Sequence, residues 1–291
     1  FGLEGGERLD ALRASLTEML AFGANPLSLL PPLQRETAKY GPVARFLRIR
    51  ERTDEQIYGL IAERRALADG DDVLSMLLGA SHEDGSPMSD TEIRDELMTL
   101  LVAGHETTAT ELAWCFERLV RNPDVLRKLV AEVDAGRDEY VTATIRETLR
   151  RRPVLINAAP RKVMAEIEVG GWTYAPGCHL VPNAYLVQHD PEIYPEPYAF
   201  RPERFLDADP GTYTWIPFGG GRRRCIGASF AMLEMGIVLS ALLSRTELRS
   251  GGGHLELNRR RMITVSPSKG GRVELRSRTA SESPARAPAS V

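Results

Sequence analysis

One cysteine stands where a metal ligand could form, at the end of a glycine-rich turn. Residues 218–227 read FGGGRRRCIG, so Cys225 follows three arginines and leads directly into an apolar helical pattern. A thiolate close to guanidinium groups and to a helix N-terminus has its negative charge stabilised. The stretch is therefore typical of a ligand for a soft or redox-active metal. The alternative is a mobile basic loop with an incidental buried cysteine.

A second stretch conflicts with the helix that contains it. A capping box, S-x-x-E at 89–92, predicts the start of one long helix that ends before Pro123. In the middle of this helix, residues 103–108 read AGHETT, which places a glycine, an acid and two β-branched residues where alanine or leucine would be favoured. Because local conflicts of this kind often mark functional sites, we expect this segment to have a chemical role.

A third pair of residues has the spacing of an ion pair within one helix. Glu147 and Arg150 stand three residues apart in a helix predicted over 138–151, which Pro153 ends. On a protein surface such a pair contributes only about 0.3 kcal/mol. The same pair could instead belong to a buried charge network.

The elements that must position these residues are mostly helices. Apolar residues at helical spacing predict helices at 6–22, 52–67, 71–78, 90–122, 124–133, 138–151 and 228–243. Short apolar runs bounded by turn residues predict strands at 161–163, 167–169, 172–174, 179–181, 255–257, 262–265 and 273–275. Residues 190–217 are rich in proline and aromatics without a period, which indicates an ordered irregular segment. The pattern predicts a mainly α fold with a small β-sheet region.

Composition narrows the class of protein. The 291 residues are 43% hydrophobic and 26% charged, which is ordinary for a globular protein. A net charge of -3 argues against nucleic-acid binding, although arginines cluster at 146–152, 222–224 and 259–261.

The three cysteines are far apart and form no disulfide pattern, so we expect a reducing, cytoplasmic setting. Residues 226–243 are apolar but contain Glu234, so we expect a buried core helix and no transmembrane segment.

Four motifs in order resemble the cytochrome P450 family of haem-thiolate monooxygenases. The cysteine signature F-x-x-G-x-R-x-C-x-G matches Phe218, Gly221, Arg223, Cys225 and Gly227. The E-x-x-R motif matches residues 147–150, the oxygen-activating motif A/G-G-x-D/E-T-T/S matches 103–108, and FRPERF at 200–205 is similar to a further family segment. The resemblance covers the chain from Phe1 to about Leu275.

The resemblance implies the cytochrome P450 fold, with residues 1–276 as a single haem-thiolate domain and 277–291 as a disordered tail. In the family, several helices, part of the sheet and a basic residue that holds a haem propionate precede the segment that residues 1–22 resemble. We therefore expect an N-terminally incomplete version of the fold, corresponding to roughly its C-terminal two-thirds.

The resemblance also implies a role for individual residues. It makes Cys225 the axial ligand of the iron of haem b, with Arg223 and, less strictly, Arg161 paired with the propionates. Further contacts to the cofactor are implied for Phe218, Gly219, Gly221, Gly227 and Ala103. Glu106 and Thr107 would relay protons for oxygen activation. Glu147, Arg150 and Arg204 would form a buried charge network, whereas Cys115, Cys178, His105 and His189 are expected to be structural.

The implied reaction is the insertion of one oxygen atom of O2 into an apolar small molecule. The chain has no nicotinamide or flavin motif, so electrons would come from a ferredoxin or flavodoxin-type donor. Arginines 222–224 would dock this donor or, alternatively, would serve only the haem propionates and the solvent. Two alternatives stay open: a haem-thiolate peroxygenase or isomerase that needs no redox partner, and a truncated, catalytically inactive haem-binding remnant. The substrate would contact residues 101–103, 155–159 and 262–263, under a lid at 22–33.

Overall fold

The computed structural model describes residues 2–3, 5–23, 41–67, 70–207, 209–252, 255–261 and 263–278. The chain divides into two compact units, Phe1–His105 and Glu106–Val291, and each unit is described by itself. Most of the expected lid, Met262 and the chain beyond residue 278 lie outside the described residues. The assignment of residues 1–276 to a single haem domain stays a prediction.

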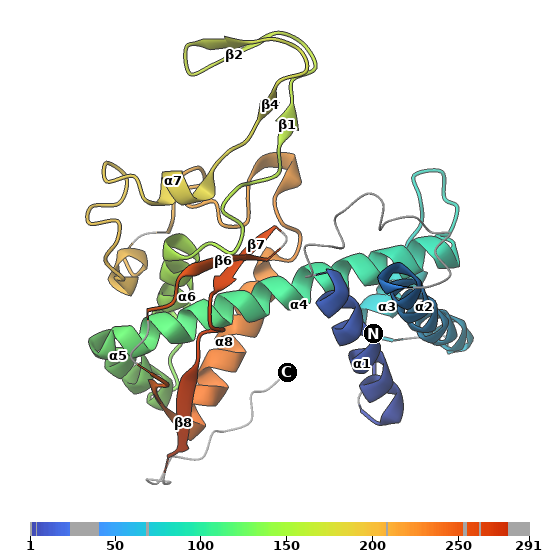
Figure 1. Cartoon of the computed structure of the whole chain (residues 1–291), viewed down its shortest axis with the longest axis horizontal. Helices are drawn as coiled ribbons and strands as arrows, with labels where there is room; N and C mark the ends of the chain where they lie inside the picture. Colours follow the sequence, from blue (N-terminus) through green and yellow to red (C-terminus); the bar gives the residue numbers. More distant parts are fainter. Residues whose placement is uncertain are drawn as a thin grey trace. The chain divides into compact units, whose positions relative to one another are not determined.

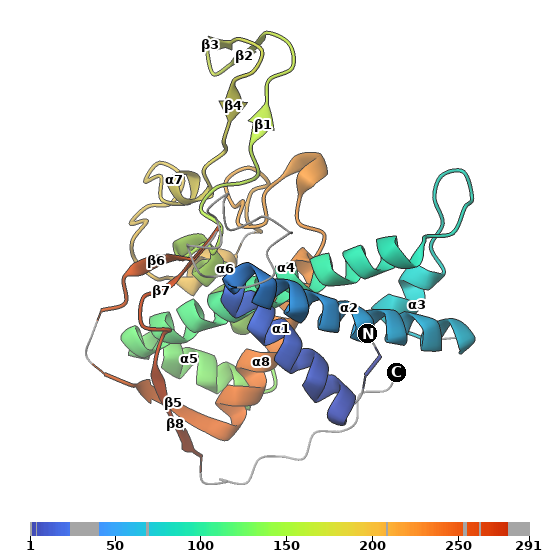
Figure 2. The same cartoon turned by 45° about the vertical axis from the view of Figure 1, so that its right-hand side comes forward.

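The first unit is built from helices. It contains α1 (Glu7–Gly23), α2 (Pro42–Ala66), α3 (Val73–Leu78) and the first half of α4 (Asp90–Arg121). Helices α1 and α2 pack against each other, as Figure 2 shows. Their apolar faces meet in a core that includes Leu12, Leu16, Ile57, Ile61, Leu74, Ile93 and Leu97. Helix α2 begins ten residues earlier than expected, at Pro42, because proline suits the first turn of a helix.

The start of α4 follows the predicted capping box. The Ser89 backbone N–H donates to Glu92 Oε2 at 2.8 Å, and the Glu92 N–H donates to Ser89 Oγ at 3.3 Å. Two N–H groups that a helix start would leave without partners are thus satisfied. The helix then runs for 32 residues without interruption through the AGHETT segment, as the sequence predicted.

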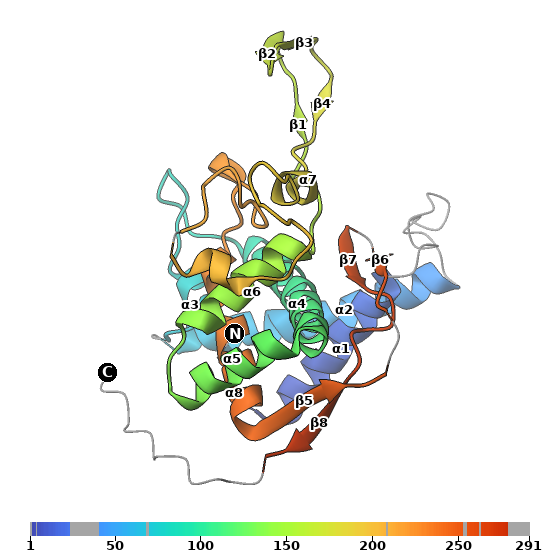
Figure 3. The same ribbon diagram turned by 90° about the vertical axis from the view of Figure 1, so that its left-hand side faces the viewer.

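The second unit has its core between three helices. Helices α5 (Pro123–Asp134), α6 (Glu139–Arg151) and α8 (Ala228–Arg245) pack against one another, and Figure 3 shows the three together. Their buried faces join the second half of α4 in a core that includes Leu119, Leu129, Ile145, Met235, Leu239 and Leu243. Phe200, Phe218 of the cysteine loop and Leu248 also pack into or against this core.

The strands form four antiparallel pairs. These are β1 (Arg161–Lys162) with β4 (His179–Leu180), β2 (Ile167–Val169) with β3 (Trp172–Tyr174), β5 (Thr246–Ser250) with β8 (Val273–Ser277), and β6 (Asn258–Arg261) with β7 (Thr264–Pro267). Figure 1 shows the chain from β1 to β4 extending as a long hairpin. A short helix α7 (Ala184–Gln188) follows it. The prediction of a mainly α fold with a small β region is confirmed.

Three local predictions were wrong. The strand expected at 255–257 begins three residues later, at Asn258, and β5 was not expected at all. Ser277, expected to begin a disordered tail, instead pairs with Thr246 in the β5–β8 ladder, and Arg278 Nη2 lies 2.7 Å from Asp134 Oδ2. The rest of the expected tail lies outside the described residues.

Helix α8 is long and apolar enough to cross a membrane by length and composition alone. Met235, Leu239 and Leu243 are buried, whereas Phe230, Leu233 and Ile237 are exposed. The expected buried core helix is therefore buried on one face only. A core helix of a globular protein passes the same hydropathy test, so the pattern is weak support for a membrane span.

Candidate functional site

Cys225 is held at the mouth of a tight glycine loop. Its backbone N–H donates to the carbonyl of Phe218 at 2.9 Å, which closes the loop. Gly219 and Gly221 have φ angles of 69° and 62°, a left-handed conformation that residues with a Cβ rarely adopt. The Cys225 side chain is exposed and forms no disulfide. The loop therefore presents its thiol outward, ready for a ligand.

The loop ends at a helix start. Gly227 immediately precedes α8, and a Cβ built on it would lie 3.9 Å from Cys225 Sγ. On the other side of the loop, the ring of Phe218 packs edge-on against Trp215, with centroids 5.9 Å apart. The loop that holds Cys225 thus lies between the N-terminus of α8, which the sequence predicted, and the ring of Trp215, whose contact with Phe218 it did not predict.

The donor set around Cys225 fits haem rather than a metal held by protein alone. No group of three or more His, Cys, Asp or Glu side chains that could hold a metal occurs among the residues that the structure describes. A metal on a single thiolate needs its remaining ligands from a prosthetic group, as a porphyrin provides. Arg222, Arg223 and Arg224 are exposed, and in the described part of the chain none of them makes an ion pair. They are therefore available to carboxylates such as haem propionates.

The E-x-x-R pair is buried, so the surface alternative does not hold. Arg150 Nε donates to Glu147 Oε2 at 2.7 Å, and both side chains are fully buried. Arg204 Nε lies 3.7 Å from Glu147 Oε1. The structure thus brings together the three residues expected to form a charge network.

The network binds the irregular segment to α6. Arg150 donates to the carbonyl oxygens of Gln188 at 2.7 Å, Pro197 at 2.9 Å and Ala199 at 3.2 Å, while Glu147 Oε1 accepts from the Arg201 N–H at 2.8 Å. A buried pair is stable only when its remaining hydrogen-bonding groups are satisfied, and these backbone contacts do so.

Trp215 connects α6 to the cysteine loop. Its indole Nε1 donates to the Arg146 carbonyl of α6 at 3.1 Å, and its ring contacts Phe218. The Ile216 N–H donates to the side chain of Gln188 at 3.0 Å. A continuous set of contacts therefore runs from α6 to the loop that holds Cys225.

The AGHETT segment of α4 has a partner that the sequence analysis missed. Glu106 Oε1 lies 3.1 Å from Nη1 of Arg261 at the end of β6, and their side chains are 22% and 42% exposed. Glu106 and Thr107 are half-buried, and Ala103 is exposed. The run of three arginines at 259–261 was the available signal, but nothing in the sequence connected it to residue 106.

Arg161 lies at the start of β1 and is exposed. Its Nη1 donates to the carbonyl of Ala159 at 2.6 Å. Its expected part in propionate binding stays a prediction.

Of the four residues expected to be structural, Cys115 and His189 are buried, whereas Cys178 and His105 are exposed. Burial raises the pKa of the Cys115 thiol to about 12, which keeps it protonated. Burial lowers the pKa of His189 to about 4, although the Tyr185 carbonyl, 2.8 Å from Nδ1, opposes the shift. Glu111, which the sequence analysis did not single out, is also buried, and burial raises the pKa of its carboxyl group well above its usual range, although the Val154 backbone N–H opposes the shift.

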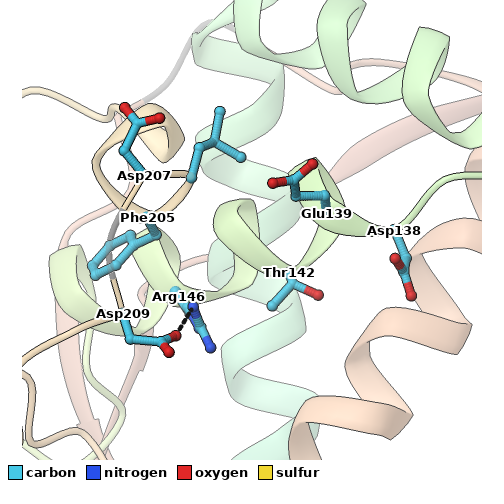
Figure 4. A pocket seen from close by; sticks show the side chains of 8 residues that line it. Asp138, Glu139, Thr142, Arg146, Phe205, Asp207 and Asp209 are labelled. Atoms are coloured by element: carbon cyan, nitrogen blue, oxygen red, sulfur yellow. Dashed lines mark ion pairs between the residues drawn. The ribbon is translucent and has the colours of Figure 1, made fainter.

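An open hollow of about 440 Å³ lies beside α6, apart from the predicted site residues. Figure 4 shows its lining, with Arg146 joined to Asp209 by an ion pair of 3.0 Å. The other lining residues are Asp138, Glu139, Thr142, Phe205, Leu206 and Asp207. Their carboxylates do not resemble the apolar substrate contacts expected from the sequence.

Solved structures establish the fold class. The heme domain of cytochrome P450DA superposes with a TM-score of 0.78 at 23% identity, covering 91% of this chain and 61% of that one. A retinoic acid-bound cyanobacterial protein, CYP120A1, has a TM-score of 0.78 at 24% identity, covering 90% and 63%. The chain therefore has the cytochrome P450 fold over about nine-tenths of its own length, which corresponds to about three-fifths of these solved structures.

Sequence comparison leads to the family. The family described as Cytochrome P450 matches residues 7–275. Cytochrome P450 138 of Mycobacterium tuberculosis is 41% identical over 277 residues, covering 94% of this chain and 63% of the relative. Cytochrome P450 137 of the same species is 40% identical over 280 residues, covering 95% and 58%. This chain belongs to the cytochrome P450 family, whose cofactor is haem b, and it spans about three-fifths of these relatives' length.

Proposed function

We propose that this chain carries the catalytic centre of a haem-thiolate monooxygenase, which inserts one oxygen atom of O2 into an apolar small molecule. The observation that supports this most directly is the exposed Cys225, held by the Phe218 carbonyl beside the start of α8. Bound haem supplies oxygen activation, which a thiolate ligand favours by donating electron density.

We assign each predicted residue the task that the family implies. Cys225 Sγ would hold the iron, and Arg223 and Arg161 would bind the propionates through charge-assisted hydrogen bonds. Gly219, Gly221 and Gly227 leave the loop without side chains next to Cys225, which leaves space for the cofactor. Phe218 and Ala103 would provide apolar contacts to the cofactor.

Proton supply is assigned to α4. We assign the half-buried Glu106 carboxyl, which forms an ion pair with Arg261, to the start of the relay. The neighbouring Thr107 hydroxyl passes the proton inward, because a hydroxyl both donates and accepts. Proton transfer by positioned groups of this kind contributes about 10²–10⁴-fold to a rate.

Electrons are assigned to a ferredoxin or flavodoxin-type protein. Arg222 and Arg224 are exposed beside Cys225, and such charges steer an acidic partner. Reversing either arginine to glutamate should slow reduction at low salt, whereas an unchanged rate would exclude this docking surface. We place the protein in the cytoplasm, since Cys115, Cys178 and Cys225 are all free.

Isotope labelling tests the reaction. The haem-loaded chain is given a chemical reductant, labelled O2 and limonene as an apolar probe, and the products are measured by mass spectrometry. We expect one labelled oxygen atom per product molecule, absent from Cys225→Ser. Product whose oxygen comes from water, or equal product from Cys225→Ser, would contradict the proposal.

A further inference from the structure

A second hollow lies at the end of α4, and no residue of the predicted haem site lines it. It encloses about 380 Å³, which is within the range of small-ligand sites. Residues from the last turns of α4, from the end of β5 and from the turn before β8 form its walls: Glu117, Val120, Arg121, Ser250, Gly251, Gly252, Glu256, Lys269 and Arg272. We call it the Gly251 pocket.

Both carboxylates of the Gly251 pocket are already satisfied by the protein. Glu117 is 3% exposed as a residue and is bound by Arg118, at 2.7 Å, and by Arg121. Glu256 is 6% exposed, and its carboxylate holds the turn at residues 268–271. It accepts from Ser268 Oγ at 3.0 Å and from the N–H groups of Lys269 at 2.6 Å and Gly271 at 3.1 Å.

Two cations of the pocket have no such partner. Lys269 and Arg272 are exposed, and within the described residues neither side chain makes an ion pair or a hydrogen bond. Arg121, the third cation of the lining, already pairs with Glu117. Among the described residues, the charge of the pocket that no protein group balances is therefore that of Lys269 and Arg272, and it is positive.

The backbone leaves room beside these cations. A Cβ on Gly251 would lie 2.9 Å from the carbonyl oxygen of Arg272, so only glycine lets the two segments come this close. Gly252 has a φ of 146°, and a Cβ there would meet no atom within 4 Å. Because Gly252 has no side chain, a ligand can come close to the backbone beside Lys269 and Arg272.

We propose that the Gly251 pocket binds a small soluble phosphomonoester. A phosphomonoester carries a charge of about -1.5 to -2 at neutral pH, which matches the unsatisfied positive charge. Its oxygens bind the Lys269 ammonium and the Arg272 guanidinium. The organic part lies against Val120 and the glycine backbone. This site does not depend on haem binding or on the proposed reaction.

Calorimetric titration of the full chain with inorganic phosphate and with adenosine monophosphate tests the proposal, at constant ionic strength and about pH 7.5, where the phosphate is mostly dianionic. We expect saturable binding of both probes, weakened about 10-fold by Lys269→Gln or Arg272→Gln and more by the double variant. The control is Arg276→Gln, an equal change of charge in β8 away from the pocket. It should alter affinity by less than about twofold.

Three results would overturn the proposal. The first is the absence of saturable binding by both probes. The second is equal binding by wild type and the double variant, or an equal loss in Arg276→Gln, since either would show a general charge effect. The third is binding to phosphatidate vesicles without binding of adenosine monophosphate, because the ligand would then be a lipid headgroup and not a soluble molecule.

Discussion

Glu106 Oε1 lies 3.1 Å from Arg261 Nη1, an ion pair that connects the AGHETT segment of α4 to the end of β6. The two residues are 155 positions apart in the sequence. The pair fixes the direction of the carboxyl group that we assign to proton supply. Because both side chains are partly exposed, the pair contributes at most about 1 kcal/mol to stability. The pair therefore matters mainly because it holds the Glu106 carboxyl group in place.

Arg261→Gln should weaken proton delivery without removing haem. If the loss of this ion pair raises the activation free energy by up to about 1 kcal/mol, the rate is about fivefold lower. We expect this decrease in O2-driven turnover, with a larger solvent isotope effect and an unchanged haem spectrum. Arg259→Gln, on the same strand, is the control. Equal isotope effects in the two variants would show that Arg261 does not position Glu106.

Thr107→Ala should separate two ways of driving the reaction. Removal of the hydroxyl is expected to lower O2-driven product formation about 10²-fold, because the group that donates the proton is then missing. Product formation with added peroxide should continue, since peroxide already brings its protons. Product yields under the two conditions check this. If both decrease alike, the hydroxyl has a structural role and the relay assignment is wrong.

Glu147→Gln should destabilise the second unit strongly. Removing one partner of a buried ion pair leaves an uncompensated charge and costs about 3–5 kcal/mol. Here the charge left behind is that of Arg150, which is fully buried. The free energy of unfolding in urea measures the effect. Glu196→Gln, which breaks the exposed pair with Arg201, is the control and should change stability by about 0.5 kcal/mol or less. Similar values for both variants would contradict the buried network.

His189 should make the protein sensitive to mild acid. Burial lowers the pKa of this residue from 6.5 to about 4 in the folded chain. Between these values the unfolded chain binds more protons than the folded one, so stability decreases as the pH falls from about 6.5 towards 4. After allowance for partial solvent screening, the effect is about 1–2 kcal/mol.

His189→Phe retains a ring that can stack on Tyr185 and removes the titration. Urea unfolding at a series of pH values should therefore show a flatter acid limb for this variant than for wild type. Identical slopes would mean that other groups cause the acid sensitivity.

The sequence predicted every long helix, because their apolar residues repeat over several turns, although it placed the start of α2 ten residues too late. The whole of α4 followed from its capping box and from Pro123, and the buried Glu147–Arg150 pair followed from the E-x-x-R resemblance. Strand β5 was missed because TELRS directly continues α8 and has no apolar alternation. The strand near residue 258 was misplaced because the apolar Leu255 and Leu257 precede it, whereas the paired residues are NRRR.

Contacts between distant segments had no local signal. The Glu106–Arg261 pair depends on where the β6–β7 hairpin meets α4, and the Gly251 pocket depends on three segments that meet only in the folded chain. A charge cluster in a sequence indicates positive potential but not the partner. These features required the structure.

The carbon monoxide difference spectrum of the reduced, haem-titrated chain tests the central claim that Cys225 is the thiolate ligand. Wild type and Cys178→Ser should both give the absorption shift of a thiolate-bound haem, because Cys178 is an exposed cysteine outside the glycine loop. Cys225→Ser should bind haem without that shift. A thiolate-type spectrum in Cys225→Ser, or its absence from wild type with haem bound, would contradict the account.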